Sequence, residues 1–224
     1  MGNGVPKSQT IHNKPKEIFH KFMKNRFTNY KTIHFGGGYV PTRHPLPSFV
    51  KNNIILAGDA GALVNPLHGG GLSPSLTSGF IAGKVAANLI PMNTLAEEDL
   101  WIYNKQIVEK YAFRYALLDL FRILLQNIPD KELEHAFANS YLPLGKIFYA
   151  REYDLLLALS RKLSQIWDQL PNVRFNLLPK NVEQINNIMI NYPNSSEKLK
   201  DWARMYEKIY ETYQKSIFIK AEEK

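Results

Sequence analysis

The feature that most constrains this chain is the stretch from residue 54 to residue 72, IILAGDAGALVNPLHGGGL. Four apolar residues, Ile54 to Ala57, predict a short buried strand, which leads directly into the turn Gly58-Asp59-Ala60-Gly61. Asp59 therefore stands at the carboxyl end of a strand. In an open α/β sheet ligands usually bind at that edge, because the loops diverge there and leave a crevice.

A glycine triplet, Gly69 to Gly71, follows the turn and precedes a long stretch with helical spacing. Ser73 is a suitable N-cap and Pro74 a suitable first helical residue. Glycines allow close approach of a bound group, and a helix N-terminus presents unpaired N–H donors and a positive dipole end. Each feature alone is common in ordinary turns and loops. Together they offer a carboxylate for hydroxyl groups and a helix N-terminus for negative charge.

One side of the helix after the triplet is nearly smooth. Its small residues are Gly79, Ala82, Gly83, Ala86 and Ala87. Glycine costs up to about 1 kcal/mol at each position in a helix interior. The two glycines therefore indicate a compensating close approach of backbone or cofactor, with tight packing of the helix on a sheet as the alternative.

This combination of strand, Gly58-Asp59-Ala60, Pro66, glycine triplet and small-residue helix resembles the second flavin-binding segment of FAD-dependent reductases and hydroxylases. With the preceding GGGYVPTR at residues 36–43, the chain is most similar to the geranylgeranyl reductase family, which includes the archaeal digeranylgeranylglycerophospholipid reductases. The resemblance covers residues 36–87.

The resemblance implies an FAD cofactor. Asp59 would accept hydrogen bonds from the ribityl chain or lie beside the pyrophosphate, and the backbone from Gly70 to Leu72 would face the pyrimidine side of the flavin ring. A helix N-terminus there would stabilise negative charge by about 0.3–1 kcal/mol, and by up to about 2 kcal/mol when partly buried. The predicted cofactor-binding residues are Gly58, Asp59, Pro66, Gly70, Gly71 and Leu72. No catalytic residue is predicted.

By the same resemblance, the function is FAD-dependent reduction of carbon–carbon double bonds in geranylgeranyl chains of membrane lipid precursors. This chain would supply the second flavin-binding segment and part of the cavity for an isoprenoid lipid substrate. Two alternatives stay open. One is a truncated, non-catalytic helical module that binds lipid or protein, and the other is a related FAD-dependent hydroxylase.

The predicted fold class is α/β (α+β), as the C-terminal part of an FAD/NAD(P)-binding flavoprotein fold. Residues 1–92 would complete the FAD-binding domain with a short sheet, and residues 93–224 would form a mostly helical domain. The chain lacks the Gly-x-Gly-x-x-Gly unit that holds the ADP half of FAD in this family. Residues 2–5 look like the end of a strand that lacks its beginning. We therefore expect a missing N-terminal half, or a reductant protein, as partner, and weak or undetectable FAD binding by the isolated chain.

Composition narrows the remaining possibilities. The chain has no cysteine, which excludes disulfides and thiolate chemistry, and no histidine pair at metal-ligand spacing, so no metal site is predicted. Its net charge of +8 favours an anionic partner. Nucleic acid is not expected, because the aromatic residues follow core periodicity. Without a spanning or signal segment, we predict a cytoplasmic protein, with peripheral contact to the membrane as an open possibility.

The N-terminal part contains a predicted amphipathic helix, residues 15–27, with one basic face. The simpler interpretation is a surface helix that packs on the sheet and exposes its basic face to solvent. The alternative is a helix that lies on an anionic membrane surface. A strand is predicted over Lys31 to Phe35. A stiff proline-rich loop follows, in which Arg43 could bind phosphate or clamp the Asp59 loop. His44 could lie near a ligand. Structural roles for both residues are the alternative.

The C-terminal part is predicted to be helical. A capping box at residues 94–97 would start one helix. Residues 111–128 predict a buried helix or the wall of an apolar tunnel, Pro129-Asp130 opens a shorter helix, and residues 152–170 form another. Three prolines, Pro171, Pro179 and Pro193, indicate a looser region before a final helix with an aromatic stripe, which is normally core.

Overall fold

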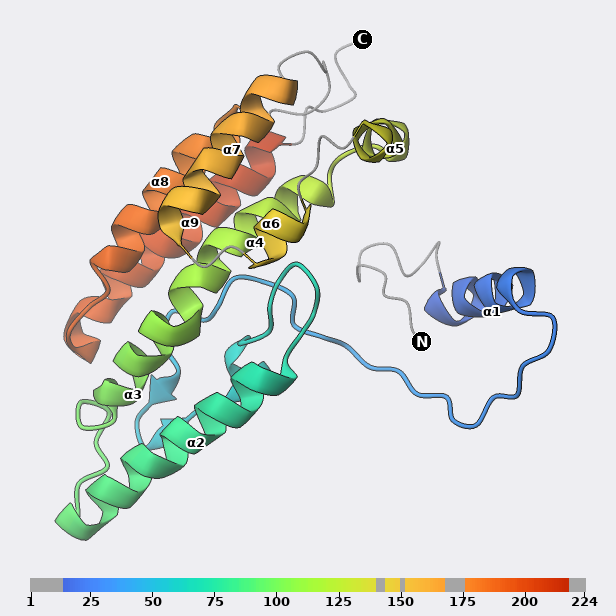
Figure 1. The fold of residues 1–224 in the computed structure, drawn as a ribbon. Helices are drawn as coiled ribbons and strands as arrows, with labels where there is room; N and C mark the ends of the chain where they lie inside the picture. Colours follow the sequence, from blue (N-terminus) through green and yellow to red (C-terminus); the bar gives the residue numbers. More distant parts are fainter. Residues whose placement is uncertain (1–13, 140–143, 150–151, 168–175, 218–224) are drawn as a thin grey trace. The chain divides into compact units, whose positions relative to one another are not determined.

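A computed structural model describes residues 14–139, 144–149, 152–167 and 176–217. The described chain is mostly helical with one small sheet, so it is an α+β protein (Figure 1). It divides into two compact units, Met1–Tyr39 and Val40–Lys224, and each is described by itself. The strand end expected at residues 2–5 and the last residues of the helix expected at 152–170 lie outside the described residues.

The part of the first unit that the structure describes, from residue 14 on, contains one helix, α1 (Pro15–Arg26), as predicted. It begins at a proline, whose missing N–H is not needed in a first turn. None of its residues is buried, and Phe35 packs beside Phe19 and stacks on His20. The strand predicted at Lys31 to Phe35 is wrong, since this segment is irregular and Ile33 is 95% exposed. Among the described residues no strand lies paired with this segment.

The sheet consists of β1 (Val50–Lys51) and β2 (Ile54–Ile55), an antiparallel pair in which Val50 faces Ile55. The two strands are joined by a turn at Asn52 and Asn53, in which Asn52 takes a positive φ of 52° that asparagine tolerates. The prediction of a buried four-residue strand is wrong, because β2 has two residues and Ile54 is 57% exposed. A strand is buried by its neighbours, and among the described residues β2 has only β1.

The helix after the glycine triplet is α2 (Leu72–Leu89), and its N-cap is Gly71, two residues before the predicted Ser73. Pro74 is therefore the third residue, still within the first turn where a missing N–H costs nothing. Pro74, Ser78 and Val85 are buried. The smooth side is not packed on a sheet: a Cβ at Gly79 or Gly83 would meet nothing within 4 Å.

The next helices run almost continuously. A 3₁₀ turn, Ile90–Met92, ends α2, and α3 (Trp101–Ile107) passes through a π-helical turn, Val108–Ala112, into α4 (Phe113–Leu125). The predicted capping box is wrong, because Thr94 bonds to Asp99 and the helix begins only at Trp101. The prediction of a buried helix is confirmed, since every residue of α4 from Tyr115 to Leu124 except Arg122 is buried.

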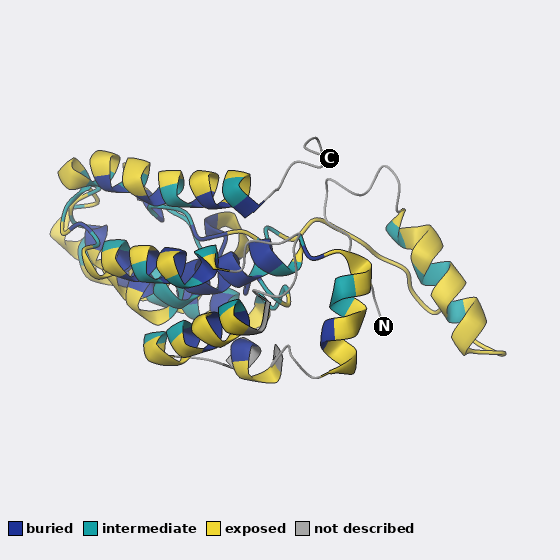
Figure 2. Cartoon of the chain, turned by 90° about the horizontal axis from the view of Figure 1, so that it is seen from above, coloured by how far each residue is buried: buried dark blue, intermediate teal, exposed yellow. Residues whose placement is uncertain are grey.

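The remaining helices follow α4 in the chain. They are α5 (Asp130–Ala138), α6 (Leu144–Tyr149), α7 (Tyr153–Trp167), α8 (Leu177–Ile190) and α9 (Leu199–Ile217), the last preceded by a 3₁₀ turn, Ser196–Lys198. Helix α8 packs on α4, α7 and α9, and α4 also contacts α7 and α9. Their buried faces turn inward and their exposed faces outward (Figure 2).

Within this bundle the aromatic stripe of α9 is core, as predicted. Its buried members are Trp202, Tyr206, Tyr210 and Tyr213. Helix α8 was not predicted, because Pro179 suggested a loop. It is the third residue of α8, where proline is tolerated. No helix among the described residues has the length and apolar character needed to cross a membrane.

Candidate functional site

The Gly-Asp turn follows β2 as a short 3₁₀ segment, Gly58–Gly61. Gly58 has a φ of +57°, and a Cβ there would lie 2.6 Å from Ser75 Oγ and 3.2 Å from Ser75 Cα. Its N–H donates to Ser78 Oγ at 2.9 Å. The turn is thus held against the first turns of α2, and only glycine fits at this contact.

Asp59 and the N-terminus of α2 face the same point. Asp59 is exposed, and its Oδ1 lies 2.9 Å from the position that a Cβ of Gly71 would occupy. Gly71 is the N-cap and Leu72 the first residue of α2. The first N–H groups of a helix have no hydrogen-bond acceptor within the helix. In α2 the first hydrogen bond of the helix runs from Ser75 N–H to Gly71 O. The arrangement therefore places a carboxylate acceptor beside helix N–H donors.

The loop between the turn and α2 is closed by its own polar groups. Asn65 accepts from Gly69 N–H and Leu67 N–H and donates its own N–H to Gly70 O, with distances of 2.9, 3.0 and 3.1 Å. Pro66 is buried within it. Gly70 N–H donates to His68 Nδ1 at 3.1 Å. Asn65 and Pro66 thus shape the loop, while the Gly70 amide is engaged within it.

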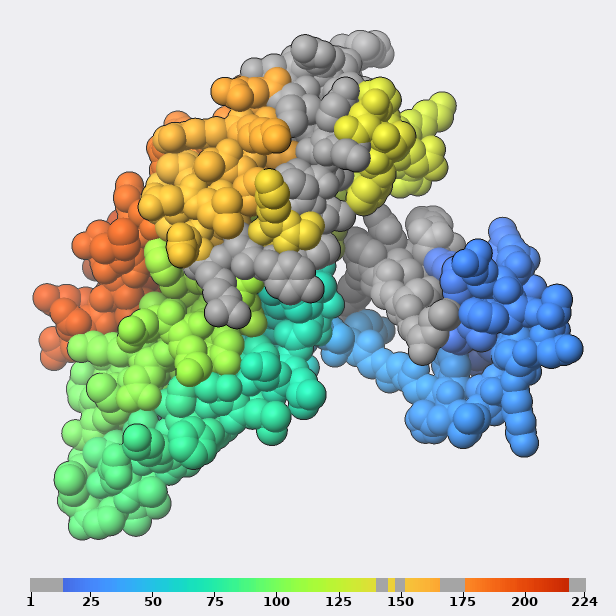
Figure 3. Space-filling model, in the orientation of Figure 1, coloured from blue at the N-terminus to red at the C-terminus, as the bar shows by residue number. Residues whose placement is uncertain are grey.

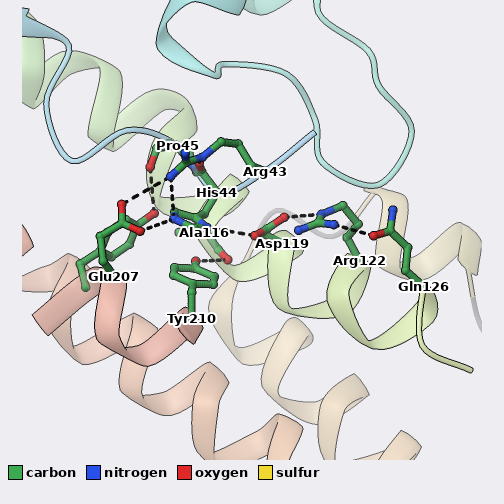
Figure 4. Close-up of polar contacts among 10 residues, drawn as sticks. Arg43, His44, Pro45, Ala116, Asp119, Arg122, Gln126, Glu207 and Tyr210 are labelled. Carbon is green, nitrogen blue, oxygen red and sulfur yellow. Dashed lines mark hydrogen bonds and ion pairs between the residues drawn. The ribbon is translucent and has the colours of Figure 1, made fainter. Parts of the chain in front are cut away.

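The proline-rich loop meets the helical bundle through a polar cluster, defined as Arg43, His44, Asp119, Arg122 and Glu207, in which His44 and Asp119 are buried (Figure 4). The Nδ1 of His44 lies 3.2 Å from Asp119 Oδ2, and its Nε2 lies 2.9 Å from Glu207 Oε2. Arg122 donates to Asp119 Oδ1 at 2.6 Å. The imidazole also stacks on the Tyr210 ring, with a centroid separation of 3.8 Å.

These contacts set the protonation of the cluster. Burial lowers the pKa of His44, but its hydrogen bonds to Asp119 and Glu207 outweigh burial and leave that pKa raised above 6.5. Burial raises the pKa of Asp119, yet the bonds from His44 and Arg122 lower it below its usual value. The hydrogen bond from His44 is the main cause of the lowered pKa of Glu207. An imidazolium that donates to two carboxylates satisfies all three groups.

The cluster favours the structural alternative for Arg43 and His44. The polar contacts that the structure describes for Arg43 are with Glu207 and His44, and none of them is with the Asp59 loop. Asp119 and Glu207 were not predicted as members. An aspartate inside an otherwise apolar helix is a signal that could have indicated a buried partner for Asp119. Glu207 lies 163 residues from His44 in sequence, and no local pattern reveals such a pair.

The fold and this site define an α+β protein whose Gly-Asp turn and glycine-led helix N-terminus share one exposed point. No protein-family model matches the chain. Curated proteins named digeranylgeranylglycerophospholipid reductase do match. The protein of Sulfolobus acidocaldarius is 29% identical over 221 residues, 96% of this chain and 48% of that protein. The protein of Methanococcus aeolicus is 35% identical over 115 residues, which are 51% of this chain and 29% of that protein.

A third relative, from Methanocaldococcus jannaschii and with the same name, is 31% identical over 137 residues, 60% of this chain and 35% of that protein. The chain is a homologue of these reductases, and the predicted resemblance to the geranylgeranyl reductase family is confirmed. It spans at most about half the length of these relatives.

Proposed function

We propose that this chain supplies the second flavin-binding segment of an FAD-dependent reductase that acts on carbon–carbon double bonds of geranylgeranyl lipid precursors. The single observation that carries the proposal is the meeting of Asp59 with the N-cap of α2, at 2.9 Å from the Gly71 Cβ position. The names of the relatives support a lipid reductase over the hydroxylase alternative.

The residues present fit such a cofactor. Asp59 is exposed and can accept hydrogen bonds from sugar-like hydroxyl groups, and a side chain at Gly71 would crowd its carboxylate. The N-terminus of α2 favours negative charge beside it. FAD, when bound, would supply the redox chemistry. The chain would hold it through Asp59 and the backbone at Gly71 and Leu72, with Gly58, Pro66 and Gly70 keeping the loop in place.

The test is flavin content. The chain is co-expressed with the part of the Sulfolobus acidocaldarius relative that it does not match, and bound flavin is measured by absorbance. Asp59→Ala removes a hydrogen bond to a charged group, worth about 1.5–3 kcal/mol, so we expect flavin affinity to fall roughly ten- to hundredfold. The chain alone is expected to hold little or no flavin.

Asp201→Ala is the matched control, because the Asp201 side chain is 85% exposed on α9. It should leave the flavin content unchanged. Flavin retained at the wild-type level in Asp59→Ala would remove Asp59 from the site. Stoichiometric flavin in the chain alone would show that no second half is needed.

A further inference from the structure

We infer that Tyr103 of α3 is a positioning residue, whose hydroxyl group fixes the backbone that carries Asp59 and so places this carboxylate beside the N-terminus of α2. Its importance for flavin rests on the proposed function. The inference adds to that function a role for the helical part of the chain, which through Tyr103 determines the geometry of the cofactor site.

The strand that leads to the Gly-Asp turn is too short to hold itself in place. β2 has two residues and, in the described part of the chain, is paired only with β1. A two-stranded hairpin alone is marginally stable in water. Leu56 follows β2 three positions before Asp59, and its N–H donates to Phe49 O at 2.8 Å. The position of Asp59 therefore depends on what holds Leu56 from outside the sheet.

Two successive residues of α3 hold the hairpin. The Tyr103 hydroxyl donates to Leu56 O at 2.8 Å, and Asn104 Oδ1 accepts from Phe49 N–H at 2.8 Å. Both side chains are 0% exposed. A main-chain polar group that is buried without a partner is costly, so these two bonds are strongly favoured in the folded chain. Helix α3 thus fixes the main chain of both sides of the hairpin, directly beside the two strands.

Helix α2 supports the same segment from the other side. Ser78 Oγ accepts from Gly58 N–H at 2.9 Å. Burial raises the pKa of Tyr103 to about 12, although a hydrogen bond with Ser78 acts in the opposite direction, so the hydroxyl is a donor at neutral pH. Helices α2 and α3 pack on each other and lie side by side in Figure 3, in teal to green and light green. Tyr103 and Ser78 together hold the chain immediately before Asp59.

The site leaves little room for error in the position of Asp59. Its Oδ1 lies 2.9 Å from the position that a Cβ of Gly71 would occupy. Groups that bind a ligand must be held within about 0.5 Å of the productive geometry by packing and by supporting hydrogen bonds. Tyr103 acts through the main chain at Leu56, not by touching the ligand. A phenylalanine at position 103 would fill the same space in the core, so apolar packing does not require the hydroxyl.

Tyr103→Phe tests this role, because it removes the hydroxyl and keeps the ring. Tyr210→Phe is the matched control. The Tyr210 hydroxyl also donates to a main-chain oxygen, that of Ala116 at 2.7 Å, and its side chain is also buried, but this bond lies between α4 and α9. The two variants should therefore lose similar global stability in urea denaturation.

The local measurement is amide hydrogen exchange in the chain alone, followed by nuclear magnetic resonance. The amides to follow are those of Ala62 and Leu63, which close the turn by donating to Asp59 O at 3.0 Å and Gly58 O at 3.1 Å. We expect their exchange to be roughly three- to tenfold faster in Tyr103→Phe, the factor that corresponds to one net hydrogen bond. In Tyr210→Phe it should stay within about twofold of the wild type.

Flavin affinity is measured on the co-expressed pair used to test the proposed function. In Tyr103→Phe it should fall roughly three- to tenfold, because Asp59 is then less well aligned with the bound group. In Tyr210→Phe it should stay within about twofold of the wild type.

Unchanged exchange at Ala62 and Leu63 in Tyr103→Phe, or equal acceleration in Tyr210→Phe, would overturn the inference, because the hydroxyl would then contribute to general stability alone. Selective acceleration with wild-type flavin affinity would also overturn it. The exchange measurement needs no flavin. If the wild-type pair binds no flavin but exchange is selectively faster in Tyr103→Phe, the placing of the turn by Tyr103 stands and only the proposed function fails.

Discussion

At the scale of single residues, His44 shows how one side chain joins distant parts of the molecule. It lies in the proline-rich loop, yet it bonds to Asp119 on α4 and Glu207 on α9, stacks on Tyr210 and meets the edge of the Tyr206 ring. Asp119 is fully buried and is held by His44 and Arg122. Breaking a buried pair leaves an uncompensated charge, so each member depends on the others.

The raised pKa of His44 predicts a pH-dependent stability. A group with a pKa raised in the folded state stabilises it fully below the unfolded pKa of 6.5, and this contribution is lost as pH rises through the folded pKa. The free energy of unfolding should therefore fall as pH increases above 6.5, with a slope of up to about 1.4 kcal/mol per pH unit. Urea denaturation of the wild type and of His44→Asn at a series of pH values measures this term as their difference.

Two further observations make the pH prediction specific. Glu207→Gln keeps His44 and Asp119 but removes one carboxylate, so the slope should be intermediate between the wild type and His44→Asn. The lowered pKa values of Asp119 and Glu207 act in the opposite direction. Their stabilisation is present above their unfolded values of 3.8 and 4.5 and is lost as pH falls through the folded ones. Identical profiles for the wild type and His44→Asn above pH 6.5 would contradict the assignment.

At the scale of elements, two glycines differ in whether a side chain could replace them: Gly58, which packs against α2, and Gly83, which belongs to α2. Gly58 packs against Ser75 with a positive φ, whereas Gly83 lies on the open face. Gly58→Ala should destabilise the chain by about 1–3 kcal/mol, because the added Cβ is both strained and overpacked. Gly83→Ala should stabilise the chain by about 0.8–1 kcal/mol, since alanine is the better residue in an exposed helix interior.

Urea denaturation of the two variants measures both changes, and a shared slope would show that only stability differs. Destabilisation by Gly83→Ala would show that its side of α2 is not open.

The elements also show what sequence can and cannot predict here. Helices with strong apolar periodicity, such as α4, α7 and α9, were predicted, because apolar residues at three- and four-residue steps indicate a helix with one buried face. The extent of β2 was not, since a strand is buried by partners elsewhere in a fold. Helix α8 was missed because Pro179 is compatible with both a loop and a first helical turn.

The candidate site divides in the same way. The meeting of Asp59 and Gly71 follows from a turn and a helix start twelve residues apart, so a sequence motif could indicate it. The bond between His44 and Glu207 spans 163 residues and depends on the packing of α9 against the rest of the bundle. No local pattern carries that information.

At the scale of the whole molecule, the lysines that contribute to the net charge of +8 lie in different surroundings on different helices. Helix α1 has no buried residue and carries exposed Lys16, Lys21 and Lys24 beside exposed Ile18 and Phe22. An amphipathic helix of this composition can bind an anionic lipid surface through its apolar face and basic residues together. Helix α9 offers an internal comparison, because its exposed Lys200, Lys208 and Lys215 belong to a helix whose aromatic face is already buried in the core.

We therefore predict that the chain binds vesicles containing anionic phospholipid, that binding weakens with salt, and that neutral vesicles are not bound. Replacing Lys16, Lys21 and Lys24 by glutamine should lower the partition coefficient on the order of a hundredfold, at about 1 kcal/mol for each charge near the surface. Co-sedimentation over a lipid titration measures it. Replacing Lys200, Lys208 and Lys215 removes the same three charges from the molecule, yet should have a much smaller effect. Equal losses in the two variants would attribute binding to net charge, and no binding by the wild type would exclude membrane association through α1.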